Sequence, residues 1–289
     1  MPLVSLALLF LLSGDAFQLG LGYYGRREYA KAAEQFAQVL AKEDPASAPY
    51  RDSTLYLAQS LYLTNRFQES IPYLEKAIAA KTRELEARYM LGNAYIQLHD
   101  QEKGAQAFAG LYGVPAGSAG AYVITAQMMI RQGLEELAEK SAGRALELNP
   151  KIPEAHYLLG EIATFHGQIE RAIAELNKEI QINPNFALAY YKLGDAFSRR
   201  ELWDEAIPQL ERAIWLNPTY SGPYIILGKA YLKRKELPNA EQILKQAIRM
   251  DPRNSSAHYL LGQAIAQQGR TEEAKKYLDL AQEFKVEKP

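Results

Sequence analysis

A repeat of 34 residues is the feature that most constrains how this chain can fold. Leucine–glycine pairs occur at Leu159-Gly160, Leu193-Gly194, Leu227-Gly228 and Leu261-Gly262, and each step between them is 34 residues. Stepping back along the chain reaches equivalent pairs at 125–126, 91–92, 57–58 and, after a longer step of 38, at 19–20. A period of this length indicates a stacked array of small units, which grows by adding repeats rather than by enlarging one core.

Other slots keep the same register when the slot of Gly160 is numbered position 8. Position 20 is nearly always small: Ala32, Ser70, Gly104, Ala138, Ala172, Ala206, Ala240 and Ala274. Position 24 is apolar: Phe36, Leu74, Phe108, Ala142, Leu176, Leu210, Leu244 and Leu278. Positions 4, 7, 8 and 11 share one helix face, as do 20, 24 and 27, so each repeat predicts two amphipathic helices, A and B. A small residue at position 8 or 20 allows these helices to approach closely, and proline at position 32 ends helix B.

This pattern resembles the tetratricopeptide repeat family, which has an aromatic at position 4, Leu-Gly at 7 and 8, Tyr at 11, Ala at 20 and Pro at 32. The resemblance covers nearly all of the chain after residue 12 and implies an all-α, right-handed superhelical solenoid. The expected organisation is an apolar N-terminal segment at 1–12 and a solenoid of eight repeats at 13–289. The repeats are 13–50, 51–84, 85–118, 119–152, 153–186, 187–220, 221–254 and 255–288.

Composition and motifs argue against several functional classes. The chain has 33 Lys and Arg against 34 Asp and Glu, so it lacks the basic excess of a nucleic-acid binder. It has no cysteine, its four histidines show no metal-ligand spacing, and no catalytic triad motif occurs. The glycines of 20–25 match a dinucleotide fingerprint, but they fall inside a predicted helix A, without the strand such a site requires. We expect no enzyme activity, no cofactor and no metal.

The candidate binding surface comes from the resemblance, since the concave wall in this family is formed largely by helix A, through positions that include 5 and 9. Position 5 holds Phe17, Leu55, Tyr89, Val123, Tyr157, Tyr191, Ile225 and Tyr259. Position 9 holds Leu21, Gln59, Asn93, Gln127, Glu161, Asp195, Lys229 and Gln263. Rings beside amides and charges suit a peptide, although tyrosine at position 5 is also ordinary in the family and partly structural. The predicted partner-binding residues are Tyr89, Asn93, Gln127, Tyr157, Glu161, Tyr191, Asp195, Lys229 and Tyr259.

The function expected from these features is a non-catalytic scaffold that binds a peptide or partner protein in the concave groove. The alternative is the substrate-targeting arm of a multi-chain enzyme assembly, such as a protein glycosyltransferase. We expect the partner to be a protein or peptide, and we expect the chain to bind no nucleic acid and no metal. Because repeat eight stops at its own helix B, Leu278 and its neighbours are expected to form an association surface, either for a partner or for self-association through the C-terminal repeat.

Two further stretches and one single residue, Glu179, carry expectations of their own. Residues 1–12 contain a single polar residue, Ser5, and match the apolar core of a signal peptide, which predicts export to the periplasm or cell envelope. The alternative is a capping helix on a cytoplasmic protein. Glu179 stands at position 27, where small apolar residues normally pack, and we expect a locally splayed helix that lets its carboxylate reach water. The glycines between 110 and 120 predict a flexible joint.

Overall fold

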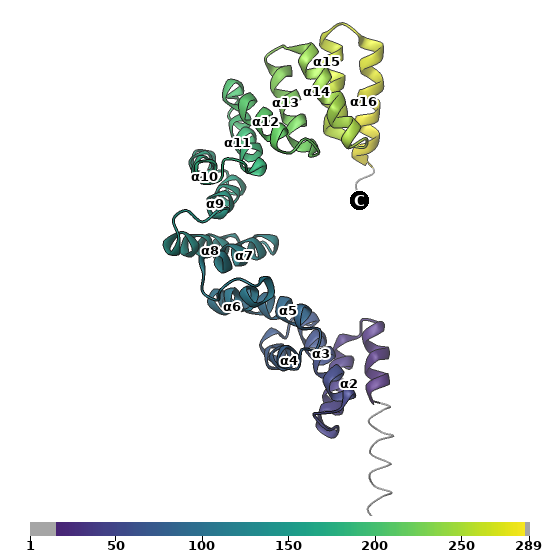
Figure 1. Cartoon of the computed structure of the whole chain (residues 1–289). Coiled ribbons are helices and arrows are strands. Elements are labelled where there is room, and N and C mark those ends of the chain that lie inside the picture. The colour runs from purple at the N-terminus through teal and green to yellow at the C-terminus, as the bar shows by residue number, and fades with distance from the viewer. Residues whose placement is uncertain (1–15, 287–289) are drawn as a thin grey trace, which may run out of the picture. The chain divides into compact units, whose positions relative to one another are not determined.

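The computed structural model of the chain describes residues 16–286, and all regular structure in that range is helical (Figure 1). The predicted signal segment, 1–12, lies outside the described residues. Residues 16–25 form a first helix. The helices that follow are α2 (Tyr29–Lys42), α3 (Ala48–Leu63), α4 (Phe67–Ala79), α5 (Glu84–Gln97), α6 (Gln101–Tyr112), α7 (Ala119–Arg131), α8 (Glu135–Leu148), α9 (Ala155–Phe165), α10 (Ile169–Ile182), α11 (Ala187–Arg199), α12 (Trp203–Leu216), α13 (Ser221–Lys233), α14 (Leu237–Met250), α15 (Ser255–Gln267) and α16 (Thr271–Val286).

The helices group into two compact units, an N-terminal unit that ends at Pro150 and a C-terminal unit that begins at Lys151. Within each unit every helix packs on the next one along the chain, as a helical repeat array requires. In the C-terminal unit the odd-numbered helices α9, α11, α13 and α15 also contact one another in turn, and α3, α5 and α7 do so in the N-terminal unit. These are the predicted A helices, so each unit has a continuous layer of A helices backed by B helices. The all-α repeat fold is therefore confirmed.

The glycine at position 8 lies directly beneath the side chain at position 24 of its own repeat. A Cβ added at Gly160 would lie 2.8 Å from Cγ of Leu176, and one added at Gly194 would lie 2.6 Å from Cγ of Leu210. The same contact joins Gly20 to Phe36, Gly92 to Phe108, Gly228 to Leu244 and Gly262 to Leu278. Glycine inside a helix costs stability, and here the cost is offset because the large side chain of helix B fills the space a Cβ would occupy.

Helix B ends where the sequence places its stop signal. Asn149, Asn183, Asn217 and Asp251 are the C-cap residues of α8, α10, α12 and α14, and each is followed by the position-32 proline. Proline disfavours helical geometry in the residue before it, which accounts for the common end point. The glycine-rich stretch is more regular than its composition indicates, since Gly110 and Gly120 lie within α6 and α7. Only residues 113–118 connect those two helices.

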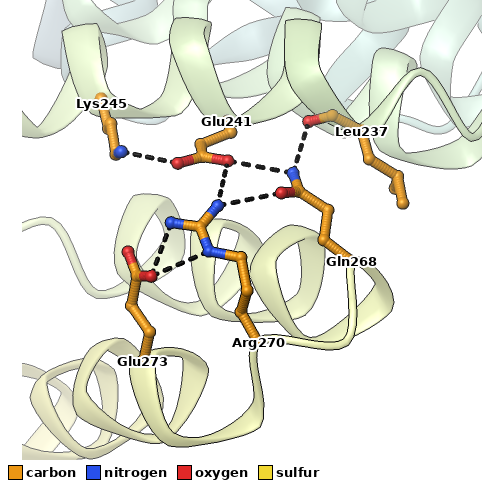
Figure 2. A network of polar contacts seen from close by, with 6 residues as sticks. All are labelled: Leu237, Glu241, Lys245, Gln268, Arg270 and Glu273. Carbon is orange, nitrogen blue, oxygen red and sulfur yellow. Dashed lines mark hydrogen bonds and ion pairs between the residues drawn. The ribbon is translucent and has the colours of Figure 1, made fainter.

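A polar network joins the last two repeats on the side of helix α14 (Figure 2). The Glu241 carboxylate accepts hydrogen bonds from Lys245 Nζ at 2.6 Å, Arg270 Nη1 at 2.8 Å and Gln268 Nε2 at 3.0 Å. Gln268 Nε2 also donates to the carbonyl oxygen of Leu237 at 3.3 Å. The hydrogen bond from Lys245, helped by those from Arg270 and Gln268, outweighs burial and holds the pKa of Glu241 at about 2. The network therefore ties the turn between α15 and α16 to the preceding repeat.

The packing of position 8 predicts opposite effects for two glycine-to-alanine substitutions. Gly194→Ala should lower the free energy of unfolding by about 1–3 kcal/mol, because the new Cβ collides with Leu210. Gly143→Ala in α8 is the matched control, since an added Cβ there has no neighbour within 4 Å. It should raise stability by about 0.5–1 kcal/mol through the helix preference of alanine. Thermal unfolding followed by circular dichroism measures both, and equal effects would contradict the packing role.

The Glu241 network predicts a loss of stability in acid. The folded pKa of Glu241, about 2, lies below its ordinary value of 4.5, so its contribution is fully present above pH 4.5 and disappears as the pH falls toward 2. Glu241→Gln should therefore lower the melting temperature by about 2–4 °C at neutral pH and have little effect near pH 2. Melting curves of both proteins between pH 2 and 7 test this. A gap in melting temperature that stays constant over that range would show that the charge of Glu241 does not matter.

Candidate functional site

The three predicted site residues of the N-terminal unit differ in exposure. Tyr89 on α5 is 46% exposed and its ring is open to a ligand. Asn93, one turn later, is buried: its side-chain amide donates to the Tyr89 carbonyl at 2.8 Å, and its oxygen accepts from Gln132 at 2.5 Å. Gln127 lies half-buried on α7. Asn93 therefore serves the packing of α5 and α7, and Tyr89 is the accessible member of this set.

In the C-terminal unit, Tyr157 and Glu161 lie together on α9, but both make contacts within the solenoid. Tyr157 is buried, and its ring packs edge-on against Phe186 with centroids 5.0 Å apart. Burial, together with the nearby carboxylate of Glu161 on the same helix, raises the pKa of Tyr157. Glu161 also pairs with Lys192 of α11 at 2.8 Å. These side chains link α9 to α11.

The next pair along the helix A layer, Tyr191 and Asp195, is also engaged. Tyr191 packs edge-on against Tyr220 with centroids 5.2 Å apart, and burial beside that ring raises the pKa of Tyr191. The carboxylate of Asp195 forms an ion pair with Arg199, one turn later on α11, with Oδ2 and Nε 2.9 Å apart. Both residues are half-buried. The carboxylate of Asp195 therefore already has a partner, and the ring of Tyr191 is packed within the unit.

Lys229 and Tyr259, the last two predicted residues, line a groove of about 910 Å³ at the C-terminal end of the helix A layer. We call it the end groove. Its lining consists of Ile225, Lys229, Ser255, Ser256, Tyr259, Leu260, Leu278, Ala281, Gln282 and Lys285. Tyr259 is 50% exposed, and its hydroxyl oxygen accepts a hydrogen bond from Gln263 at 2.9 Å. Two of the predicted residues thus border one shared, open cavity.

Most of the end groove's polar lining was not predicted from helix A positions. Ser255 and Ser256 begin α15, and Gln282 and Lys285 lie on α16, a B helix. Of the lining residues on α16, only the apolar Leu278 was singled out, through the expected association surface at repeat eight. The missed signal is a change of residue type on helix B: position 31, which is Asn or Asp in the three preceding repeats, is Lys285 in this one.

Whether a tyrosine at position 5 is covered depends on the residue at position 34 of the same repeat. The two covered tyrosines, Tyr157 and Tyr191, meet aromatic residues from position 34 of their own repeats, Phe186 and Tyr220. In the repeat of the exposed Tyr89, position 34 holds Ser118. Its side chain caps the start of α7 and supplies no ring to cover Tyr89. An aromatic side chain at position 34 is therefore the sequence signal for a structural tyrosine, and its absence marks an open one.

The expectation for Glu179 is wrong, since its side chain is fully buried rather than reaching water. Its carboxylate caps the start of α9, accepting the backbone N–H of Glu154 at 2.8 Å and that of Tyr157 at 3.3 Å. Glu154, the N-cap residue of α9, has φ 72° and supplies no side-chain cap of its own. A helix start leaves several N–H groups unsatisfied, and Glu179 from α10 satisfies two of them. Burial nevertheless raises the pKa of Glu179, more than these hydrogen bonds lower it.

Within residues 16–286 no group of three or more potential metal ligands is found. His156 Nδ1 and Glu175 Oε2 are hydrogen-bonded at 2.6 Å. Burial raises the pKa of Glu175, but hydrogen bonds from Lys178 and His156 outweigh it and leave that pKa below its ordinary value. The pair joins α9 to α10 and serves their packing. No helix in the described range is long and apolar enough to span a bilayer.

The buried Glu179 predicts a pH effect of the opposite sign to that of Glu241. Because its folded pKa lies above 4.5, the unfolded chain ionises first, and stability is lost as the pH rises from about 4.5 through the folded pKa. Glu179→Gln does not titrate, and it turns an NH₂ group toward one of the two N–H donors, which costs about 1–3 kcal/mol. We therefore expect the variant to melt lower, with the largest deficit in acid.

Melting curves of wild type and Glu179→Gln between pH 4 and 8 measure this difference. A deficit that grows with pH would mean that the ionised carboxylate is the stabilising form, contrary to the expectation. Glu136→Gln, at an exposed site on α8, is a control for the loss of one carboxylate in a different helix.

Comparison with known proteins identifies the repeat. The tetratricopeptide repeat model matches residues 17–84, 57–121 and 227–285, and a second TPR model matches 166–200. The first model alone covers more than half of the 289 residues. No curated protein sequence matches the chain.

Solved structures with the same fold cover somewhat more than half of this chain. A crystal structure of MamA is 28% identical, with a TM-score of 0.51 over 56% of this chain and 94% of MamA. MamA from Desulfovibrio magneticus RS-1 is 23% identical, with a TM-score of 0.53 over 58% and 95%. YrrB, described as a TPR protein with an unusual peptide-binding site, is 23% identical, with a TM-score of 0.54 over 63% and 94%. With its repeat register, its helix pairs and this coverage by the repeat model, the chain belongs to the tetratricopeptide repeat family.

Proposed function

We propose that this protein is a non-catalytic scaffold that binds a peptide segment of a partner protein in the end groove of its C-terminal unit. Its membership of a repeat family of interaction scaffolds supports a protein partner. The observation that carries the proposal is the combination of an apolar floor with cationic groups that lack a counterion. The two features together suit a peptide that has apolar side chains and a carboxylate.

The charges of the groove separate it from the rest of the helix A layer. Lys229 and Lys285 are its only charged lining residues, and neither has a carboxylate partner within the described part of the chain. The Nζ atom of Lys229 lies 5.6 Å from the ring centre of Trp203. Elsewhere in this layer, Glu161 and Asp195 are paired with cations. A ligand carboxylate would therefore find unpaired positive charge here and not at α9 or α11.

Uncharged groups of the lining can serve a peptide backbone. Ser255 donates its hydroxyl hydrogen to the carbonyl of Ala281 at 2.8 Å, which leaves its oxygen as an acceptor. Ser256 and Gln282 make no side-chain hydrogen bond to the described residues. Tyr259 adds a ring that is half exposed before any ligand binds. Rings provide contact area at a low entropic cost, which is why they dominate binding energy in many interfaces.

The test is a peptide selection on the immobilised full chain, followed by affinity measurements on variants. Peptides selected from a random display library should lose at least about 10-fold in affinity when Tyr259→Ala and Lys229→Ala are combined, because an aromatic anchor and a counterion are removed. Tyr89→Ala is the matched control, since Tyr89 occupies the same position 5 and is similarly exposed, at 46% against 50% for Tyr259. Circular dichroism should show that all variants remain helical.

The proposal fails if the selected peptides bind the Tyr259 and Lys229 double variant as tightly as they bind the wild type. It also fails if Tyr89→Ala removes binding instead, because the peptide site would then lie in the N-terminal unit.

A further inference from the structure

The end groove is an open copy of a slot that the chain fills three times with its own helices. At position 24 of the preceding repeats, Leu176, Leu210 and Leu244 are fully buried. Each belongs to a B helix on which the next A helix packs: α10 on α11, α12 on α13 and α14 on α15. Leu278 holds the same position on α16 and is only partly buried. The internal slots therefore show what shape of ligand fits this groove.

At the α14–α15 boundary, the helix that fills the internal slot is α15. There Leu244 packs in one cluster with Leu261 and Ala264 of α15, and Ala247 packs with Ala257. The α15 residues are spaced by three and four, so one helical stripe of small and apolar side chains fills the slot. At the end groove, Leu278 and Ala281 repeat Leu244 and Ala247 at positions 24 and 27. The apolar floor that accepts such a stripe is thus present.

The rim of the end groove differs from that of the internal slots. Position 28 is isoleucine in the three preceding repeats and is Gln282 here, while position 31 changes from Asn or Asp to Lys285. In an internal slot, position 31 lies beside the start of the incoming helix: Asp251 is the C-cap of α14, and α15 begins at Ser255. A helix that lies in the end groove in the same direction would therefore begin beside Lys285.

Resting on the proposed function, we propose that the end groove binds an amphipathic α-helix of a partner protein, with a small apolar stripe and acidic residues in its first turn. The floor selects the stripe, because it reproduces the surface that α14 offers to α15. Lys285 selects the charge, because it lies where the helix begins and has no counterion in the described chain. Acidic residues in a first turn are also favoured by the helix dipole, so both effects act on the same residues.

The experiment uses the full chain and three synthetic helical peptides as probes. The first copies Ser255–Gln267, with Ser255→Asp and Ser256→Glu, and carries a side-chain staple on its outer face because a free peptide of this length is marginally helical. The second has lysine at both positions instead. The third is the acidic peptide without the staple and with Leu261→Pro. Fluorescence anisotropy measures the affinity of each for the wild type, Lys285→Glu, Lys276→Glu and the double variant Tyr259→Ala with Lys229→Ala.

We expect the stapled acidic peptide to bind the wild type at least about five-fold more tightly than the lysine peptide, the size of effect that one or two exposed ion pairs produce. Lys285→Glu should reverse this preference. Lys276→Glu is the matched control: Lys276 is exposed on the same helix but does not line the groove, so the preference should be unchanged.

Three results would overturn the inference in distinguishable ways, and a fourth would overturn the proposed function itself. Equal affinity for the acidic and lysine peptides would remove the role of Lys285. Equal binding of the proline-containing peptide would mean that the groove takes an extended segment, which leaves the proposed function intact. Sedimentation that shows dimers which the acidic peptide dissociates would make a second copy of this chain the occupant. If the stapled peptide's affinity is unaffected by the Tyr259 and Lys229 double variant, the proposed site itself is wrong.

Discussion

The contact between a small residue at position 8 and a large one at position 24 is the interaction on which the rest of the structure depends. It brings helix B against helix A in each repeat, as Gly194 and Leu210 show, and so leaves the A helices free to form their own continuous layer. A binding face made of A helices exists only because of that layer. Where position 8 is alanine, as in repeats two and four, the added methyl group is small, and in repeat four position 24 is alanine as well.

Glu179 shows how the array accommodates a buried carboxylate in a slot made for a small apolar residue. The chain enters α9 through Glu154 in a left-handed conformation and without a local side-chain cap. A carboxylate from the following helix takes over that role and satisfies the N–H groups of Glu154 and Tyr157. Removing a buried hydrogen-bond acceptor costs more than the bond itself contributes, which makes the start of α9 dependent on a residue 25 positions away.

The C-terminal unit has charged side chains that are paired with one another and others that are not. Glu161 pairs with Lys192 of the next A helix, Asp195 pairs with Arg199 within α11, and Glu241 pairs with Lys245 and Arg270, so all three carboxylates already have cationic partners. Lys229 and Lys285 border an apolar groove without such partners. Unpaired charge beside uncovered apolar surface is a combination that favours a binding role over a structural one.

The sequence by itself determined the fold, the helix ends and the buried slots, because each of these depends on residues a few positions apart that recur every 34 residues. Position-5 tyrosines look alike in such a pattern. Only the tertiary structure showed that rings from position 34 pack against Tyr157 and Tyr191, whereas Tyr259 is half exposed. The burial of Glu179 and the end groove on α16 likewise arise from contacts between helices, which no periodicity within one helix encodes.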